Sequence, residues 1–404
     1  MKQKMRRKFL AAVVTLGLVM GTAFGAYAKE VVHSSGEVSV STWVDGKEQG
    51  PVRTVFKDGS VVWAFSSDNH AVGCMVAYGG DGPDAVWLSS GGELNGLGIG
   101  ILKNGTQKAN FYEDDEIKKS VRLKSWTTEN KIRFYAREES DIDDGKAIAV
   151  FPSGDIYVGD FKDGMRSGWG TYFYSSDKTW YMGEWKDGLM DGVGYMTFPD
   201  SSLYLYKSAV WTKGKCQNVV FYYTEKDEVF LAANKDNIAQ GPAAIIKADG
   251  TITLREYKDN KISNAEPKIY ADKYGNQYIG TDGKSGSGLK VTKRGDIQIG
   301  SFKNGELDGQ GFVYWGDRMR RDEGTFKQGS CTEGVTIWAN GSYFKGTYKD
   351  YLRSQYDQGI FRCFTYSKEG EFNKYNELET GIYKIFQKDG SATKKVYLYG
   401  EEKK

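Results

Sequence analysis

Two histidines, His33 and His70, are the first residues to consider for catalysis or metal binding. A serine nucleophile that works with a histidine often lies in a Gly-x-Ser-x-Gly turn, and a zinc site often has two histidines a few residues apart. Neither pattern accompanies His33 or His70. We therefore expect no catalytic residue and no metal ligand at either position.

Two other segments have the composition of a ligand site without its spacing. Gly283-Lys284-Ser285 looks like the end of a phosphate-binding loop, but the upstream position that requires glycine is Tyr278, and no helix is expected to follow. The acidic turns at residues 81–84 and 141–145 lack the ligand spacing of a calcium loop. The sequence therefore predicts no cofactor and no metal. Paired carboxylates for glycoside hydrolysis remain open, since they need only be neighbours in space.

Seven lysines share one position in successive copies of a short motif. They would recur along one rim about every 9 to 10 Å, the width of two strands, and such a row could follow a polyanion such as a wall polymer or lipid headgroups. The alternative, which the sequence favours, is a charge-compensated turn, because most of these lysines precede an aspartate, as Lys162 precedes Asp163. The lysines are Lys162, Lys186, Lys235, Lys258, Lys303, Lys327 and Lys349.

Aromatic residues present the same choice between packing and binding. Tryptophan, tyrosine and phenylalanine make up 57 of the 404 residues, and most of them recur in phase with the motif, which predicts a role in the core. Four tryptophans in the N-terminal third fall outside this phase and are candidates for a partner surface. They are Trp43, Trp63, Trp87 and Trp126.

The motif itself occurs in three clear copies. The first runs from Tyr157 to Gly170 as YVGDFKDGMRSGWG, the second from Tyr181 to Gly194 as YMGEWKDGLMDGVG, and the third from Gln298 to Gly311 as QIGSFKNGELDGQG. This pattern resembles the MORN (membrane occupation and recognition nexus) repeat. The resemblance implies an extended β meander, without enzymatic activity, that mediates protein contacts or oligomerisation.

The glycine at position 168 marks a phase that can be followed along the chain. Markers, or their degenerate substitutes, recur every 22 to 26 residues from Gly50 to Glu379. Each period contains two turn signals, one at Lys-Asp-Gly and one such as Asn104-Gly105, so each repeat should be one β-hairpin. About fifteen such units predict an all-β, elongated repeat solenoid, an antiparallel meander of roughly 140 Å before twist.

The paired glycines of the motif should make room for aromatic rings. Gly168 and Gly170 lie at alternate positions and should open space on one sheet face for a ring of the adjacent strand. We expect Phe161 and Trp185 to occupy that space, so that Gly168→Val would clash. The four cysteines, Cys74, Cys216, Cys331 and Cys363, lack the density and spacing of a disulfide framework, and we expect four free thiols.

The N-terminus has the layout of a secretory signal peptide. Five basic residues within the first eight precede an apolar run from Phe9 to Phe24 and the small residues of Ala26-Tyr27-Ala28, which predicts cleavage after Ala28. Without this segment, 50 basic residues face 53 acidic ones, a net charge of −3. A near-neutral mature chain argues against nucleic acid as the partner.

The predicted organisation is a signal peptide at 1–28, a short lead at 29–36, degenerate repeats at 37–144 and repeats at 145–404, clearest at 157–198 and 298–315. We expect an exported, non-enzymatic binding or scaffold protein of the periplasm, cell envelope or medium, with a protein or envelope component as its partner. One alternative is a cell-wall or polysaccharide-binding repeat protein. Another is an enzyme with its site in the eroded N-terminal third, for which a cleft near His70 would be the sign.

Overall fold

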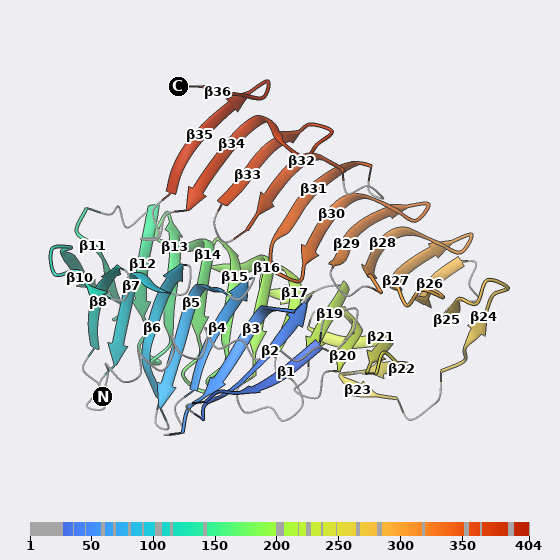
Figure 1. Cartoon of the computed structure of the whole chain (residues 1–404), viewed down its shortest axis with the longest axis horizontal. Helices are drawn as coiled ribbons and strands as arrows, with labels where there is room; N and C mark the ends of the chain where they lie inside the picture. The colour runs from blue at the N-terminus through green and yellow to red at the C-terminus, as the bar shows by residue number, and fades with distance from the viewer. Residues whose placement is uncertain are drawn as a thin grey trace.

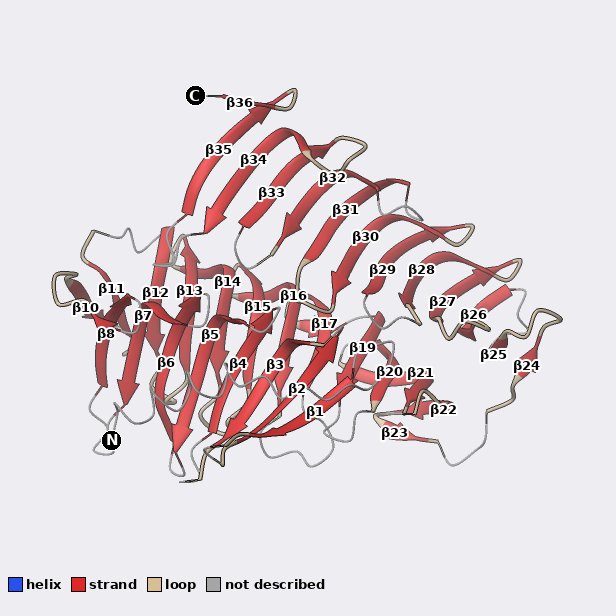
Figure 2. Cartoon of the chain, in the orientation of Figure 1, coloured by secondary structure: helices blue, strands red, loops and turns tan. Residues whose placement is uncertain are grey.

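The described part of the chain is entirely β (Figure 2). The computed structural model describes residues 27–34, 36–44, 46–57, 61–67, 70–79, 82–90, 93–101, 107–113, 116–139, 144–198, 206–216, 218–223, 228–235, 237–247, 249–263, 267–280, 285–316, 320–350, 355–363, 366–386 and 392–403. Nearly all of the predicted signal peptide, residues 1–26, lies outside these ranges, as do the turns proposed around Asp141 and Gly283.

The first sheet, sheet A, has nine strands paired antiparallel in chain order. They are β1 (Tyr27–Val32), β2 (Val38–Val44), β3 (Lys47–Val55), β4 (Val61–Ser67), β5 (His70–Gly79), β6 (Gly82–Ser90), β7 (Glu93–Ile101), β8 (Gln107–Glu113) and β9 (Glu116–Ile117).

The second sheet, sheet B, has fourteen strands, of which β18 pairs only with β17. They are β10 (Leu123–Thr127), β11 (Arg133–Arg137), β12 (Asp144–Val150), β13 (Ile156–Lys162), β14 (Met165–Phe173), β15 (Trp180–Lys186), β16 (Leu189–Thr197), β17 (Tyr206–Thr212), β18 (Lys215–Cys216), β19 (Asn218–Tyr223), β20 (Val229–Lys235), β21 (Ile238–Ile246), β22 (Ile252–Lys258) and β23 (Lys261–Ile262).

The third sheet, sheet C, has thirteen strands in chain order. They are β24 (Tyr270–Ala271), β25 (Gln277–Ile279), β26 (Ser285–Val291), β27 (Ile297–Lys303), β28 (Glu306–Tyr314), β29 (Arg320–Lys327), β30 (Ser330–Trp338), β31 (Tyr343–Asp350), β32 (Gln355–Arg362), β33 (Tyr366–Phe372), β34 (Leu378–Phe386), β35 (Ala392–Leu398) and β36 (Glu401–Lys403).

The predicted antiparallel hairpin meander is confirmed, but it is divided into three sheets instead of forming one. The divisions fall after β9 and β23, in the units whose marker glycine is replaced by Lys119 and Asn264. Both of these last strands are only two residues long. A strand this short offers too few backbone groups to continue the ladder, so the next unit begins a new sheet.

The three sheets fold back onto one another and share a core, so the meander does not run on as one continuous sheet (Figure 1). Between sheets A and B, the ring centroids of Trp63 and Trp180 are 6.1 Å apart, and those of Phe65 and Tyr195 are 4.8 Å apart. Tyr343 of sheet C stacks on Trp169 of sheet B, with centroids 6.5 Å apart. Folding back occurs because strands of both sheets are apolar on one face and must bury it.

The opposite face of sheet B carries a second cluster of buried aromatic residues. Tyr157, with none of its surface exposed, lies across Gly159 and Gly170, because a β-carbon at Gly170 would come 2.3 Å from the Tyr157 hydroxyl. Tyr181 lies across Gly183 and Gly194 in the same way. The rings over the paired glycines are therefore Tyr157 and Tyr181, not Phe161 and Trp185 as predicted.

Gly168 is required for a different reason. It lies in a β-bulge, where the register shifts after Gly159, and its φ of +60° is in the left-handed region. The carboxylate of Asp160 accepts a hydrogen bond of 3.1 Å from the Trp169 N–H and fills the space beside it. Gly168→Val therefore remains destabilising, through backbone strain and the Asp160 contact rather than through a ring.

Two side-chain hydrogen bonds between described residues link sheets B and C. Arg321 of β29 donates to the Ser208 hydroxyl of β17, and Tyr343 of β31 donates to Glu184 of β15. The Tyr343 hydroxyl donates to Oε1 of Glu184 at 2.6 Å, while Oε2 of Glu184 accepts the Val193 N–H at 2.7 Å. Burial and the negative charge of Glu184 raise the pKa of Tyr343 well above its ordinary value. The tyrosine therefore stays a donor over the physiological pH range.

Tyr343→Phe should lower the free energy of unfolding by about 1.5 to 3 kcal/mol, because it leaves a partly buried carboxylate with one hydrogen bond fewer. Urea denaturation measures this loss. Tyr375→Phe is the matched control, since Tyr375 is 71% exposed and its removal should leave stability unchanged. Equal stability of the two variants would show that this contact does not hold sheet C against sheet B.

Candidate functional site

Two-residue turns at one end of the hairpins form the most regular surface of the molecule. The turns Asp163-Gly164 and Asp187-Gly188 have positive φ at both residues, 50° and 71° in the first and 50° and 78° in the second. Such a turn matches the twist of the flanking strands and joins them without slack. The lysine of the motif is the last strand residue before each turn, as Lys162 ends β13 and Lys186 ends β15.

The predicted lysine row is divided between two sheets. Lys162, Lys186, Lys235 and Lys258 end β13, β15, β20 and β22 of sheet B, whereas Lys303 and Lys327 end β27 and β29 of sheet C, and Lys349 is next to last in β31. The six whose side chains are described are all exposed. One continuous row does not form, because the meander breaks between β23 and β24.

Backbone hydrogen bonds connect the successive turns of sheet B. The Gly188 N–H donates to the carbonyl of Arg166 at 3.0 Å, the Gly214 N–H to that of Met190 at 2.8 Å, and the Asn260 N–H to that of Ala239 at 3.0 Å. These three turns are therefore each held by the hairpin before them. The side chains at the turns are carried on a rigid edge rather than on free loops.

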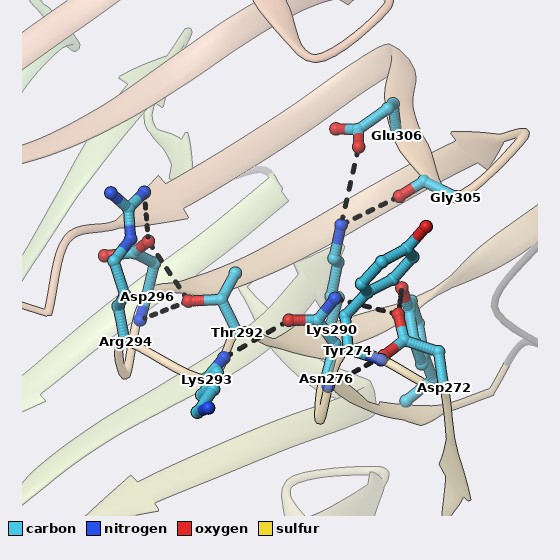
Figure 3. Close-up of polar contacts among 11 residues, drawn as sticks. Asp272, Tyr274, Asn276, Lys290, Thr292, Lys293, Arg294, Asp296, Gly305 and Glu306 are labelled. Carbon is cyan, nitrogen blue, oxygen red and sulfur yellow. Dashed lines mark hydrogen bonds and ion pairs between the residues drawn. The ribbon is translucent and has the colours of Figure 1, made fainter.

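Arg166 supports this edge from the aromatic face. Its guanidinium lies 4.6 Å from the ring centroid of Trp185 and 5.0 Å from that of Tyr172, and it donates a 2.6 Å hydrogen bond to the carbonyl of Gly188 in the next turn. Lys290 does the same in sheet C, with Nζ 2.9 Å from the carbonyl of Gly305 (Figure 3). In each case a cation, half-buried at Arg166 and buried at Lys290, ties one hairpin to the turn of the next.

The residue after each two-residue turn was not anticipated from the sequence. Met165, Leu189 and Ile238 are paired across the hairpin with Lys162, Lys186 and Lys235. They are 44%, 47% and 43% exposed, although large apolar side chains usually lie inside. At the same position sheet C has Glu306 and Ser330, opposite Lys303 and Lys327.

These six residues of sheet B, Lys162, Met165, Lys186, Leu189, Lys235 and Ile238, are here named the sheet B rim. Among the described side chains, Lys162 and Lys186 form no ion pair, although each is followed by an aspartate. Lys349 of sheet C differs, since its Nζ lies 3.4 Å from Asp357 and 2.9 Å from the carbonyl of Phe372. The choice between a charge-compensated turn and a binding row therefore stays a prediction for Lys162 and Lys186.

The other candidates of the sequence lie elsewhere. Trp63 is fully buried between sheets A and B, so its assignment to a partner surface is wrong. Trp43 donates to Ser41 at 3.0 Å, and Trp126 stacks on Phe134 with centroids 5.1 Å apart. The side chains of Trp87 and His70 lie outside the described part of the structure.

His33 is buried in the turn between β1 and β2, where its Nε2 lies 2.8 Å from the Ser39 hydroxyl, which is in turn 2.9 Å from that of Thr54. Burial lowers the pKa of His33 from its ordinary value, and the nearby Glu37 opposes this only in part. The arrangement keeps a neutral histidine inside sheet A.

Acidification should therefore destabilise sheet A. The pKa of His33 is lower in the folded chain than in the unfolded chain, where it is about 6.5. The neutral histidine therefore contributes to the free energy of unfolding above about pH 6.5, and this contribution is lost as the pH falls toward the folded-state pKa. Urea denaturation should show the stability difference between the wild type and His33→Gln shrinking from neutral pH to about pH 5. A difference that does not change with pH would contradict the buried neutral histidine.

Three cysteines, Cys216, Cys331 and Cys363, are free, as predicted, and the side chain of Cys74 is outside the described set. Burial raises the pKa of the Cys331 thiol to about 12, which makes it unreactive. The described residues contain no group of three histidine, cysteine or acidic side chains placed to hold a metal ion. They also contain no helix long and apolar enough to cross a membrane.

Comparison with known proteins agrees with the motif. The model of the MORN repeat matches residues 157–179, 181–203 and 299–320, so the chain contains MORN repeats at three positions. No curated protein matches the chain.

Three solved structures match this chain with low TM-scores. The TCP domain of SAS-4 (dCPAP) from Drosophila melanogaster, in complex with a proline-rich motif of Ana2 (dSTIL), is 9% identical, with 71% of this chain and 98% of that chain covered and a TM-score of 0.20. The TCP10 domain of Danio rerio CPAP is 11% identical, with 70% and 99% covered and a TM-score of 0.14. A streptogramin B lyase is 12% identical, with 81% and 92% covered and a TM-score of 0.14.

Proposed function

From its three MORN repeats and the hairpins around them, we propose that this chain is a non-enzymatic binding and scaffold protein that contacts a protein or cell-envelope partner through the sheet B rim. One observation carries the proposal. A lysine and an apolar residue face each other across the turn of three hairpins of one sheet, and the apolar residue of each pair is more than 40% exposed.

Exposed apolar side chains repeated on a rigid edge favour a binding surface. Isolated exposed leucines are common, but three exposed apolar side chains on the hairpins of one sheet, with Lys162 and Lys186 beside them, suit a partner with an apolar strip and acidic groups. The hairpin between Leu189 and Ile238 differs, since Lys215 lies opposite Thr212 there. Two of the three rim turns are fixed to the preceding hairpins by backbone hydrogen bonds, from Gly188 to Arg166 at 3.0 Å and from Asn237 to Cys216 at 3.2 Å. Binding would therefore lose little conformational entropy, which favours affinity.

A second candidate function is binding to a polysaccharide of the envelope. It is favoured by Tyr274, Tyr375 and Tyr399, which lie in turns and are 67%, 71% and 80% exposed. Tyrosine rings exposed to this degree can stack on sugar rings. A sedimentation assay with isolated cell walls separates the two functions, because only this second one predicts binding that the Tyr274→Ala, Tyr375→Ala variant loses.

Export is the second part of the proposal, and it rests on the basic, apolar and small-residue segments of residues 1–28. Mass spectrometry of the N-terminal peptide from the native source should find a chain that begins at Lys29. A mature chain that retains Met1 and the apolar segment would contradict cleavage.

The partner can be sought by co-purification from the native compartment. The wild type is compared with a rim variant that carries Met165→Ser, Leu189→Ser and Ile238→Ser, and with a control variant that carries Lys303→Glu and Lys327→Glu on sheet C. We expect a protein or envelope component that the wild type and the control retain and the rim variant loses. Retention of the same component by all three proteins would rule out the rim as its binding surface.

A further inference from the structure

The first strand of sheet C is an open sheet edge. β24 comprises only Tyr270 and Ala271, and among the described strands it pairs with β25 alone. The Asp272 N–H donates to the carbonyl of Asn276 at 3.0 Å. Because neighbouring residues of an antiparallel strand alternate in direction, Tyr270 turns its backbone groups toward β25 and Ala271 turns its own toward the open side.

The surroundings of this edge are cationic and apolar. Ile269, Tyr270 and Tyr274 are 50%, 37% and 67% exposed. The amino groups of Lys268 and Lys273 lie 4.8 Å and 5.0 Å from the ring centroids of Tyr270 and Tyr274. A charged ammonium over an exposed ring keeps both groups at the surface beside the strand.

One further cation, Lys293, stands next to this strand's turn, whereas Arg294 beside it in sequence pairs with Asp296. The side chain of Lys293 lies against Gly275, and its backbone N–H donates to Asn276 at 3.2 Å (Figure 3). The Arg294 side chain is 81% exposed. Asp296 is buried and bonded to Thr292 at 3.1 Å and to Arg294 at 3.3 Å.

Asp272 is occupied by its own loop. Its carboxylate accepts hydrogen bonds from the backbone of Tyr274 and Asn276, both at 2.9 Å, and from the Tyr278 hydroxyl at 3.0 Å. Partial desolvation works against ionisation, but the bonds from Asn276, Tyr274 and Tyr278 outweigh it and lower the pKa of Asp272 to about 2. This carboxylate shapes the turn and stays ionised, so it offsets one of the positive charges of Lys268, Lys273 and Lys293. These three lysines still outnumber it among the described side chains beside β24.

We propose that β24 binds an extended, acidic segment of a partner protein by strand addition. The backbone of Ala271 would pair with the incoming strand, its acidic side chains would meet Lys268, Lys273 and Lys293, and its apolar side chains would cover Ile269 or Tyr274. Exposed edges flanked by lysine commonly resist pairing with like edges. The same lysines favour a strand of opposite charge. This surface is separate from the sheet B rim.

The test uses the full chain and a fluorescent peptide of alternating aspartate and valine, followed by anisotropy. Lys268→Glu with Lys273→Glu should weaken binding by about tenfold, and Ala271→Pro, which removes an outward N–H that β25 does not use, should weaken it similarly. The control variant Lys303→Glu with Lys327→Glu should bind as the wild type does. Binding should also fall as salt concentration rises.

Backbone pairing is tested separately from charge. A peptide of the same sequence with N-methyl groups on alternate amides keeps its charge but cannot extend the sheet, and we expect it to bind at least about tenfold more weakly. Equal binding of the methylated peptide, or of polyphosphate, would overturn strand addition. Equal binding by the Ala271→Pro variant, with the folded state confirmed by circular dichroism, would also overturn it.

Discussion

Gly170→Val should lower the free energy of unfolding by about 3 to 4 kcal/mol, from overpacking of about 1 to 3 kcal/mol together with a lost hydrogen bond. A β-carbon at Gly170 would come 2.3 Å from the hydroxyl oxygen of Tyr157 and 2.5 Å from Cζ. Tyr157 is fully buried and donates a 2.9 Å hydrogen bond to the carbonyl of Asp160. The ring therefore has no space into which it can move.

The measurement is urea denaturation, with Gly188→Ala as the control. Nothing lies within 4 Å of a β-carbon at Gly188, but its φ is +78°. The free energy of unfolding of Gly188→Ala should fall by only about 1 kcal/mol, because this change adds backbone strain alone. The double variant Gly170→Ala, Tyr157→Ala should lose less free energy of unfolding than the two single variants lose together. The reason is that the new β-carbon at position 170 would occupy space that the Tyr157 ring fills in the wild type. Additive losses would show that Tyr157 does not pack on Gly170.

The second large effect concerns the sheet B rim. A variant with Met165→Ser, Leu189→Ser, Ile238→Ser, Lys162→Glu and Lys186→Glu should lower affinity for the co-purified partner about 100-fold. Three half-exposed apolar side chains contribute about 0.5 to 1 kcal/mol each when covered, and two reversed charges add about 1 kcal/mol. Together they amount to about 3 kcal/mol, or two factors of ten.

Stability should not account for that loss. Exposed substitutions of this kind usually change the free energy of unfolding by no more than about 0.5 kcal/mol each, and the urea midpoints of variant and wild type should agree closely. The matched control is Lys303→Glu with Lys327→Glu, at the same motif position in sheet C. An equal loss of affinity in the control would mean that general positive charge, not the rim, binds the partner.

The hairpins could be predicted from local signals. Lys-Asp-Gly places two residues with positive φ at a fixed distance from the aromatic positions, and Asp163-Gly164 and Asp187-Gly188 form the predicted turns. The sheet face of each residue also follows from strict alternation. What could not be predicted is which ring fills the space over a glycine, because Tyr157 and Phe161 lie on the same face, four residues apart.

The folding back of the sheets depends on contacts that are distant in sequence. Trp63 meets Trp180, and Tyr343 donates to Glu184 across 159 positions. A repeat pattern describes only neighbouring hairpins, which by themselves would allow a rod. The substitutions at Lys119 and Asn264 were visible as erosion, but not as the points where the sheet would divide.

The candidate site was partly predictable for a similar reason. The lysines share a motif position and could be listed from the sequence, whereas Met165, Leu189 and Ile238 looked like ordinary strand residues. Only the pairing across each turn shows that they face the lysines. Their exposed fractions of 44%, 47% and 43% belong to the folded chain, and no local sequence signal indicates them.

Hydrogen–deuterium exchange of the complex with the co-purified partner tests the central claim, that this protein binds through the sheet B rim, most directly. The rim account predicts slower exchange at residues 162–165, 186–189 and 235–238, and unchanged exchange at the equivalent turns 303–306 and 327–330 of sheet C. Protection of the sheet C turns with none at the rim would contradict it.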